Sequence, residues 1–209
     1  MRLLAAVALS VALMSGCAAN SPPEPPQARL AMEDPPASHS ATSKPPKAAR
    51  KVGDPERIRI PSIGVDAEIM KVGLKGKGTR KHMETPPGGK NLAGWFSPKM
   101  PKAEKPFARP GEVGAAVIAG HVDSKEGPDV FARLAELKRG AEILVTDKAG
   151  KTYRFKVVSK TQTDKDQLDT DAIWNEPTYP ALRLITCGGA FDKATGHYRE
   201  NVTIFADAA

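Results

Sequence analysis

Three residues in the carboxyl-terminal half of the chain carry side chains that together suit thiol acyl-transfer chemistry. Cys187 follows an apolar run, His121 ends an earlier apolar run, and Arg199 follows Cys187 after a polar loop. A thiolate is a nucleophile, an imidazole can exchange protons near neutral pH, and a guanidinium stays protonated. Arg199 therefore cannot be the base, but it can hold an oxyanion or a substrate carbonyl. The other cysteine of the chain, Cys17, lies near its beginning, so Cys187 is either a buried apolar residue or a reactive thiol.

The predicted strands place two of these side chains at one edge of the structure. Residues 115–121 are a run of small apolar residues, as expected for a strand buried on both faces, and residues 181–187 form another apolar run. His121 and Cys187 each end their run, where a side chain can leave the core and enter a cleft. Gly188 and Gly189 then allow a sharp turn and the close approach of a substrate backbone. This arrangement favours a nucleophile and its acid/base partner.

Each of the three residues also has a structural interpretation. Cys187 alone fits an inert buried thiol, His121 a structural histidine, and Arg199 a surface or ion-paired arginine. His197 is a weaker alternative for the histidine role, because it lies in a polar loop. Four scattered histidines and one cysteine in the folded part give no ligand spacing, so neither a metal nor another cofactor is expected.

The folded part is predicted to be mainly β, a closed barrel or a sandwich, because many short strands accompany a single convincing helix. That helix is predicted over residues 128–139, from helical apolar spacing between Pro128 and Gly140. Two Pro- and Gly-rich segments, residues 85–90 and 96–111, are predicted to be loops that form substrate walls. The predicted strands cover residues 57–61, 115–121, 142–147, 152–160, 181–187 and 201–206.

The first 52 residues are predicted to be an export signal and a tether. Residues 1–17 have a basic start, an apolar stretch and small residues, which is typical of an export signal. The end of this segment resembles the lipobox of bacterial lipoproteins, in which the cysteine, here Cys17, is acylated; a plain cleaved signal and an uncleaved anchor remain as alternatives. Residues 18–52 contain eight prolines and cannot bury a core. Fully extended, they would reach on the order of 100 Å. The folded domain is then residues 53–209.

The net charge of +7, from 31 Lys and Arg against 24 Asp and Glu, is a mild basic excess. It fits either attraction to an anionic envelope surface or an ordinary lysine-rich solvated surface. Nucleic-acid binding is poorly supported, because the chain has no basic run with interleaved aromatic residues.

With these residues in place, the domain resembles the sortases, and most of all the class F group of actinobacteria. Singly the motifs are weak, but their order and spacing are specific. The resemblance covers residues 56–206, and its motifs are residues 58–65, 93–96, 119–123, 130–134, 140–143, 184–189 and 198–202.

The resemblance implies a closed sortase-type β-barrel of about eight strands, with one or two short helices, and cysteine transpeptidation or hydrolysis. Cys187 would attack the Thr-Gly bond of a Leu-Pro-X-Thr-Gly-like sorting signal, and His121 would protonate the leaving amine. Arg199 would hold the oxyanion and the substrate, and Thr186 would assist as a hydrogen-bond donor. The implied partners are surface proteins with a carboxyl-terminal sorting signal and an amine on a cell-wall precursor or pilin. The implied location is the outer face of the cell membrane of a Gram-positive actinobacterium.

Two features depart from the family pattern, and other classes remain open. Arg183 stands where the family has the first threonine of Thr-Leu-X-Thr-Cys, and a lipobox replaces the usual transmembrane anchor. The alternatives are an L,D-transpeptidase, another thiol hydrolase such as a cysteine peptidase, and a non-catalytic lipoprotein that binds partners on a sortase fold. The setting of Cys187 and the order of His121 before Cys187 count against the two other enzyme classes. A binding module would need none of the three side chains.

Overall fold

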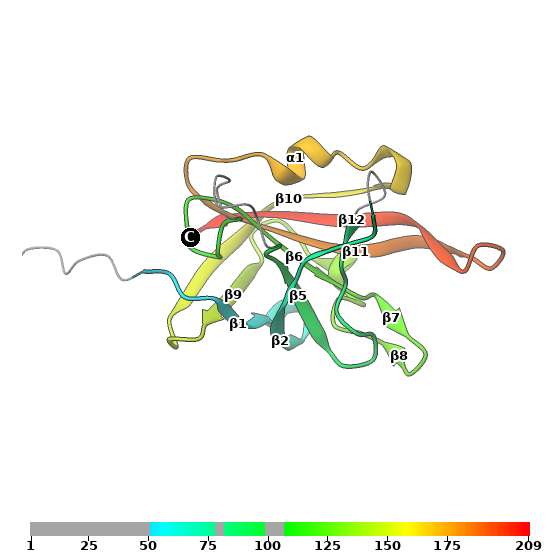
Figure 1. Ribbon diagram of the computed structural model, residues 1–209, viewed down its shortest axis with the longest axis horizontal. Helices are drawn as coiled ribbons and strands as arrows, with labels where there is room; N and C mark the ends of the chain where they lie inside the picture. The colour runs from blue at the N-terminus through cyan, green and yellow to red at the C-terminus, as the bar shows by residue number, and fades with distance from the viewer. Residues whose placement is uncertain (1–50, 78–81, 99–106) are drawn as a thin grey trace, which may run out of the picture. The chain divides into compact units, whose positions relative to one another are not determined.

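A computed structural model of the protein describes residues 51–77, 82–98 and 107–209. The predicted export signal, Cys17 and nearly all of the predicted tether lie outside these residues. Within them, eight strands close into a barrel in the order β1-β2-β5-β6-β11-β12-β10-β9 (Figure 1). The predicted mainly-β class and closed barrel are therefore confirmed. The barrel strands are β1 (Pro55–Ile60), β2 (Val65–Val72), β5 (Leu92–Phe96), β6 (Gly114–Gly120), β9 (Glu142–Asp147), β10 (Thr152–Asp164), β11 (Pro180–Asp192) and β12 (His197–Ala208).

Short elements decorate the barrel. The single α-helix among the described residues, α1 (Thr170–Trp174), lies in the connection from β10 to β11 (Figure 1). Asp169 caps this helix by accepting a hydrogen bond from the Ala172 N–H at 2.8 Å. Two small ribbons pair β3 (Leu74–Lys75) with β4 (His82–Met83), and β7 (Asp123–Ser124) with β8 (Gly127–Pro128). The 3-10 turns are η1 (Pro61–Ile63), η3 (Leu134–Glu136) and η4 (Lys165–Gln167).

The core fills the barrel interior with the inward-facing residues of alternate strand positions. In β10, Phe155 and Val157 are buried while Arg154 and Lys156 are exposed, as the alternation predicts. Each large apolar side chain that is removed from water in this way contributes about 1.5–3 kcal/mol. The interior cluster also includes Ile58, Ile118, Phe131, Leu184 and Ile204.

The helix predicted over residues 128–139 is wrong. That segment forms turns and the 3-10 turn η3 instead. Its backbone bonds join each residue to the third one before it, from Leu134 N–H to Phe131 C=O and from Leu137 N–H to Leu134 C=O. Phe131, Leu134 and Leu137 are all buried, and their three-residue spacing matches the period of a 3-10 turn better than that of an α-helix.

Two parallel strand pairs interrupt an otherwise antiparallel barrel, and one of them positions the candidate site. β2 pairs with β5, and β6 pairs with β11, in parallel. The β6–β11 register runs from Pro180 beside Gly114 to Ile185 beside Ala119. His121 directly follows the carboxyl end of β6. The prediction that the other strand ends at Cys187 is wrong, because β11 runs on through Gly188 and Gly189 to Asp192 and the thiol lies inside the strand.

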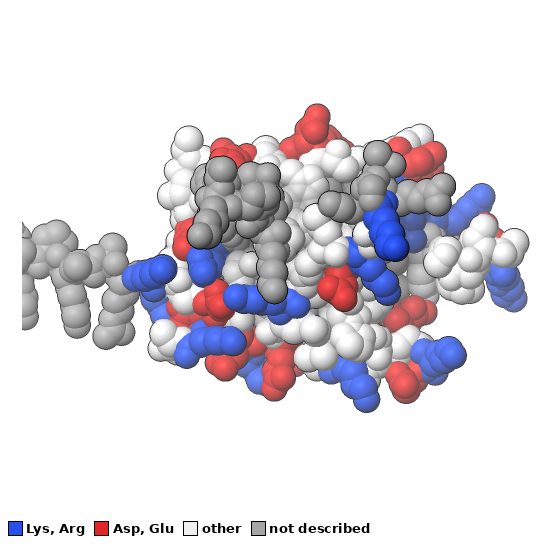
Figure 2. Space-filling view, viewed as in Figure 1, with Lys and Arg blue, Asp and Glu red and all other residues white. Residues whose placement is uncertain are grey.

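Charged side chains are mixed on the surface. Figure 2 shows Lys and Arg side chains interspersed with Asp and Glu side chains on the face that it presents. Several of them form exposed ion pairs, such as Arg57 with Asp66 and Arg154 with Glu142. This face has the character of a solvated surface of mixed charge, and attraction to an anionic envelope stays a prediction.

Candidate active site

The pairing of β6 with β11 brings His121 and Cys187 into the lining of one cavity. The parallel register of the two strands ends with Ile185 beside Ala119, and Cys187 and His121 each lie two residues further along the chain. Between these levels, the Thr186 hydroxyl donates a buried hydrogen bond of 2.9 Å to the Gly120 carbonyl oxygen. This bond ties the residue before the thiol to the residue before the imidazole.

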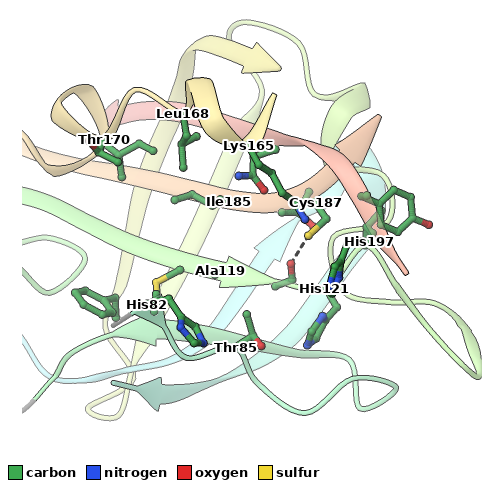
Figure 3. A pocket seen from close by; sticks show the side chains of 18 of the residues that line it. His82, Thr85, Ala119, His121, Lys165, Leu168, Thr170, Ile185, Cys187 and His197 are labelled. Carbon is green, nitrogen blue, oxygen red and sulfur yellow. Dashed lines mark hydrogen bonds between the residues drawn. The ribbon is translucent and has the colours of Figure 1, made fainter. Parts of the chain in front are cut away.

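Both side chains line a cavity of about 1110 Å³ (Figure 3). Cys187 is half-buried and is a free thiol. One wall of the cavity is β11 itself, and the connection from β10 to β11 forms another wall through Leu168, Ile173 and Trp174. The cavity can therefore hold an extended peptide beside the thiol.

One end of the cavity is strongly apolar. Phe96 packs against Phe107 with ring centroids 4.7 Å apart and against Trp174 at 4.9 Å. Phe107 comes from the predicted loop 96–111 and Thr85 from the predicted loop 85–90, and both line the cavity. Such a cluster can pack against an apolar side chain, and no polar group there would need a hydrogen-bond partner.

His121 is held by a backbone acceptor. Its Nε2 lies 2.7 Å from the Pro86 carbonyl oxygen. A carbonyl oxygen can only accept, so Nε2 carries a hydrogen, and Nδ1 is the nitrogen left to exchange a proton. Gly120, just before it, tolerates no side chain, because an added Cβ would come within 2.6 Å of Phe131 and Val130. The glycine lets the strand end approach the core closely enough to place the histidine.

A second contact joins two cavity-lining residues, Tyr198 and Asp123. The Tyr198 hydroxyl, on β12, donates to the Asp123 carboxylate at 2.5 Å, and Tyr198 packs edge-on against Phe191 of β11 at 5.2 Å. The hydrogen bond to Asp123 raises the pKa of Tyr198, with smaller contributions from burial, from the Asp123 charge and from the Cys187 thiolate. The β11–β12 hairpin is thus fastened to the segment that follows His121.

The other predicted site residues are placed differently. Arg199 on β12 is exposed and does not line the cavity, although its strand neighbours Tyr198 and Asn201 do. Thr186 lines the cavity, but its hydroxyl proton is engaged by Gly120. A donor role of Thr186 toward substrate stays a prediction, and that bond counts against it.

Several cavity residues were not singled out from the sequence. Lys165 on η4 is the one Lys or Arg among the described residues that line the cavity. His82 of β4 lines it too. His197, the weaker alternative for the histidine role, is exposed at the start of β12 and also lines the cavity. Asn201 lies directly across from Cys187 in the β11–β12 ladder. None of these positions follows from composition or spacing, because each depends on how distant strands meet.

The described part of the chain holds no group of three or more His, Cys, Asp or Glu residues that could bind a metal ion. It also contains no helix of the length and apolar character needed to cross a membrane.

The fold and the cavity define a class: a closed mixed β-barrel in which a free cysteine within one strand and a histidine just after the adjacent parallel strand line one cavity. A model of the sortase domain matches residues 58–209, and the chain therefore belongs to the sortase family. Sortases as a family are transpeptidases that act outside the cytoplasm in association with the membrane.

Solved sortases share this fold at low sequence identity. A lid mutant of sortase A from Corynebacterium diphtheriae is 21% identical with a TM-score of 0.52, over 74% of this chain and 69% of that one. Sortase C-1 from Actinomyces oris is 22% identical with a TM-score of 0.52, over 74% and 71%. The sortase D5 transpeptidase from Clostridium perfringens is 22% identical with a TM-score of 0.50, over 75% and 79%. No curated protein matches the chain.

Proposed function

We propose that this protein is a cysteine transpeptidase of the class F type that cleaves a Leu-Pro-X-Thr-Gly-like sorting signal between Thr and Gly. The observation that supports it most is that Cys187 of β11 and His121, which follows the neighbouring strand β6, both line one cavity. The apolar end formed by Phe96, Phe107 and Trp174 suits the Leu and Pro of such a signal.

The chemistry runs in two acyl transfers. The Cys187 thiolate attacks the threonine carbonyl carbon, and the C–N bond breaks as protonated His121 gives a proton to the leaving glycine nitrogen. An amine on a cell-wall precursor or pilin then attacks the thioester, His121 takes the proton of that amine, and the C–S bond breaks. Nδ1 of His121 carries this proton, because Nε2 is bonded to Pro86. Arg199 holds the substrate backbone and the developing negative charge from the cavity rim.

The attachment to the membrane is part of the proposal. Cys17 is acylated after the export signal is cleaved, and residues 18–52 hold the domain away from the membrane of a Gram-positive actinobacterium. Mass spectrometry of the membrane-associated protein tests this point. A diacyl-sized mass increase at an amino-terminal Cys17 is expected, and an unmodified Cys17 would exclude lipidation.

The central test uses full-length protein in detergent with a Leu-Pro-X-Thr-Gly peptide and hydroxylamine. Wild type should show a thioacyl adduct on Cys187 and release the glycine fragment, and Cys187→Ala should abolish both adduct and release. The other cysteine of the chain gives the matched control, since Cys17 lies outside the catalytic domain and Cys17→Ala should leave adduct and release unchanged. Continued cleavage by Cys187→Ala would refute the assignment.

A further inference from the structure

We infer that Asn201 is a catalytic residue, whose side-chain amide donates a hydrogen bond to the oxyanion that forms on the Cys187 acyl adduct. The inference rests on the proposed acyl transfer and assigns a role to Asn201, which lies in the motif of residues 198–202 but has no role in the sequence analysis.

The strand register carries the first step of the argument. In the antiparallel β11–β12 ladder, Cys187 pairs with Asn201. Residues directly opposite each other in such a ladder have Cβ atoms about 4.5–5.5 Å apart and project to the same face. Both side chains line the cavity and both are half-buried, so the amide stands beside the thiol and is open to a substrate.

The second step concerns the hydrogen bonding of the Asn201 side-chain amide. The described residues provide no hydrogen-bond partner for the Asn201 side chain, although two N–H donors are available there. Its near neighbours are engaged: the Thr186 hydroxyl donates to Gly120, and the Tyr198 hydroxyl donates to Asp123. A free amide in a mainly apolar cavity is a donor held ready for charge that appears only during the reaction.

Arg199 does not fill this place from where it stands. It lies two residues before Asn201 on the exposed part of β12 and does not line the cavity. Asn201 therefore donates next to the carbon that Cys187 attacks, and the charge of Arg199 supports the substrate and the same oxyanion from outside the cavity lining.

The experiment separates acyl transfer from simple thiol reactivity. Full-length protein is treated with 4-nitrophenyl acetate, whose transfer to Cys187 passes through an oxyanion, and in parallel with iodoacetamide, whose displacement reaction does not. Mass spectrometry follows modification of Cys187 in both cases. Asn201→Ala, and Asn201→Leu of similar size, should slow acetylation by about 10²–10³-fold while alkylation stays within about threefold of wild type, as expected for loss of one oxyanion donor.

Thr203→Val is the matched control, since Thr203 lies on the same face of β12 but outside this cavity. It should leave both rates unchanged. An acetylation rate of Asn201→Ala within threefold of wild type would overturn the inference. An equal fall in the rates of acetylation and alkylation would also overturn it, because Asn201 would then only support the thiol. If the acetylation rate fell only in Lys165→Met, the oxyanion donor would be Lys165 and not Asn201. If wild type is acetylated but cleaves no sorting-signal peptide, the proposed function fails while this test stands.

Discussion

The hydrogen bond from Thr186 to Gly120 offers a measurable link between the fold and the site. Thr186→Val keeps the shape of the side chain and removes the donor. The Gly120 carbonyl then loses a partner that is buried with it, at 2.9 Å in the native protein. Leaving a buried acceptor without a donor costs about 1–3 kcal/mol.

Thr203 supplies an unusually close comparison for that change. Both threonines are buried, with 4% and 1% of their surface exposed, and they lie on adjacent strands. The Thr203 hydroxyl, however, has no hydrogen-bond partner among the described residues. Thr203→Val therefore removes a hydroxyl whose burial is uncompensated, and it should be neutral or stabilising.

Urea unfolding, followed by the fluorescence of Trp95 and Trp174, measures both variants. Thr186→Val should lower the unfolding midpoint without changing the slope, and its Tm should fall by about 2–4 °C for each kcal/mol lost. Thr186→Ser, which keeps the hydroxyl, should retain most of the stability. Because the bond also joins the residue before Cys187 to the residue before His121, peptide turnover by Thr186→Val should fall by as much as about 10²-fold. Equal stability of Thr186→Val and Thr203→Val would refute the reasoning.

Two further predictions concern other hydrogen bonds. Asp147 accepts four of them, two on each carboxylate oxygen, from Gly53, Tyr153, Ala149 and Lys151. Asp147→Asn leaves two donors without an acceptor in either orientation, and it should cost on the order of 2–4 kcal/mol. Burial alone would raise the pKa of Asp147, but these donors together lower it. The contribution of this carboxylate is therefore full above its ordinary pKa of 3.8 and is lost as the pH falls through the lower folded value. Urea midpoints from pH 7 to 2 should show wild type and Asp147→Asn converging at the acid end, and a constant gap would contradict this. Tyr198→Phe frees the β11–β12 hairpin from Asp123, so the KM for the peptide should rise while acetylation of Cys187 by a small ester is unchanged; an unchanged KM would show that the contact is incidental.

The barrel strands could be predicted from the sequence wherever the pattern of apolar and polar residues in a strand shows which of its side chains are buried. The runs that became β6, β9, β10, β11 and β12 were all anticipated, and so was β1. The alternation of Val65, Ala67 and Ile69 with charged residues in β2 carries the same signal and was not read as a strand. β5 is harder to predict, because the glycine inside it is explained by a contact from another strand. A Cβ at Gly94 would lie 2.8 Å from the Val72 side chain. α1 has too few residues for any periodicity to show.

The candidate site, like the fold, could be predicted from the sequence only in part. The position of His121 just after a buried strand could be predicted, since it ends its own apolar run. The same reasoning was wrong for Cys187, because β11 continues through Gly188 and Gly189 to Asp192. The position of Asn201 opposite Cys187 could not be predicted, because the register of β11 against β12 shifts between Gly188 and Phe191. A ladder continued without that shift from the Phe191–Tyr198 pair would have set Val202 opposite the thiol. Spacing in the sequence does not record such an irregularity.

The parallel pairing of β6 with β11 also has a consequence for the order in which the chain folds. Antiparallel neighbours such as β9 and β10, or β11 and β12, are joined by short turns and can form early. β6 and β11 can meet only after the whole intervening stretch of chain, including the β9–β10 hairpin, has emerged and closed a long loop. During synthesis, His121 therefore emerges well before Cys187, and the two come together only when β11 pairs with β6. Completion of the barrel is the step that turns a plain cysteine into part of a site.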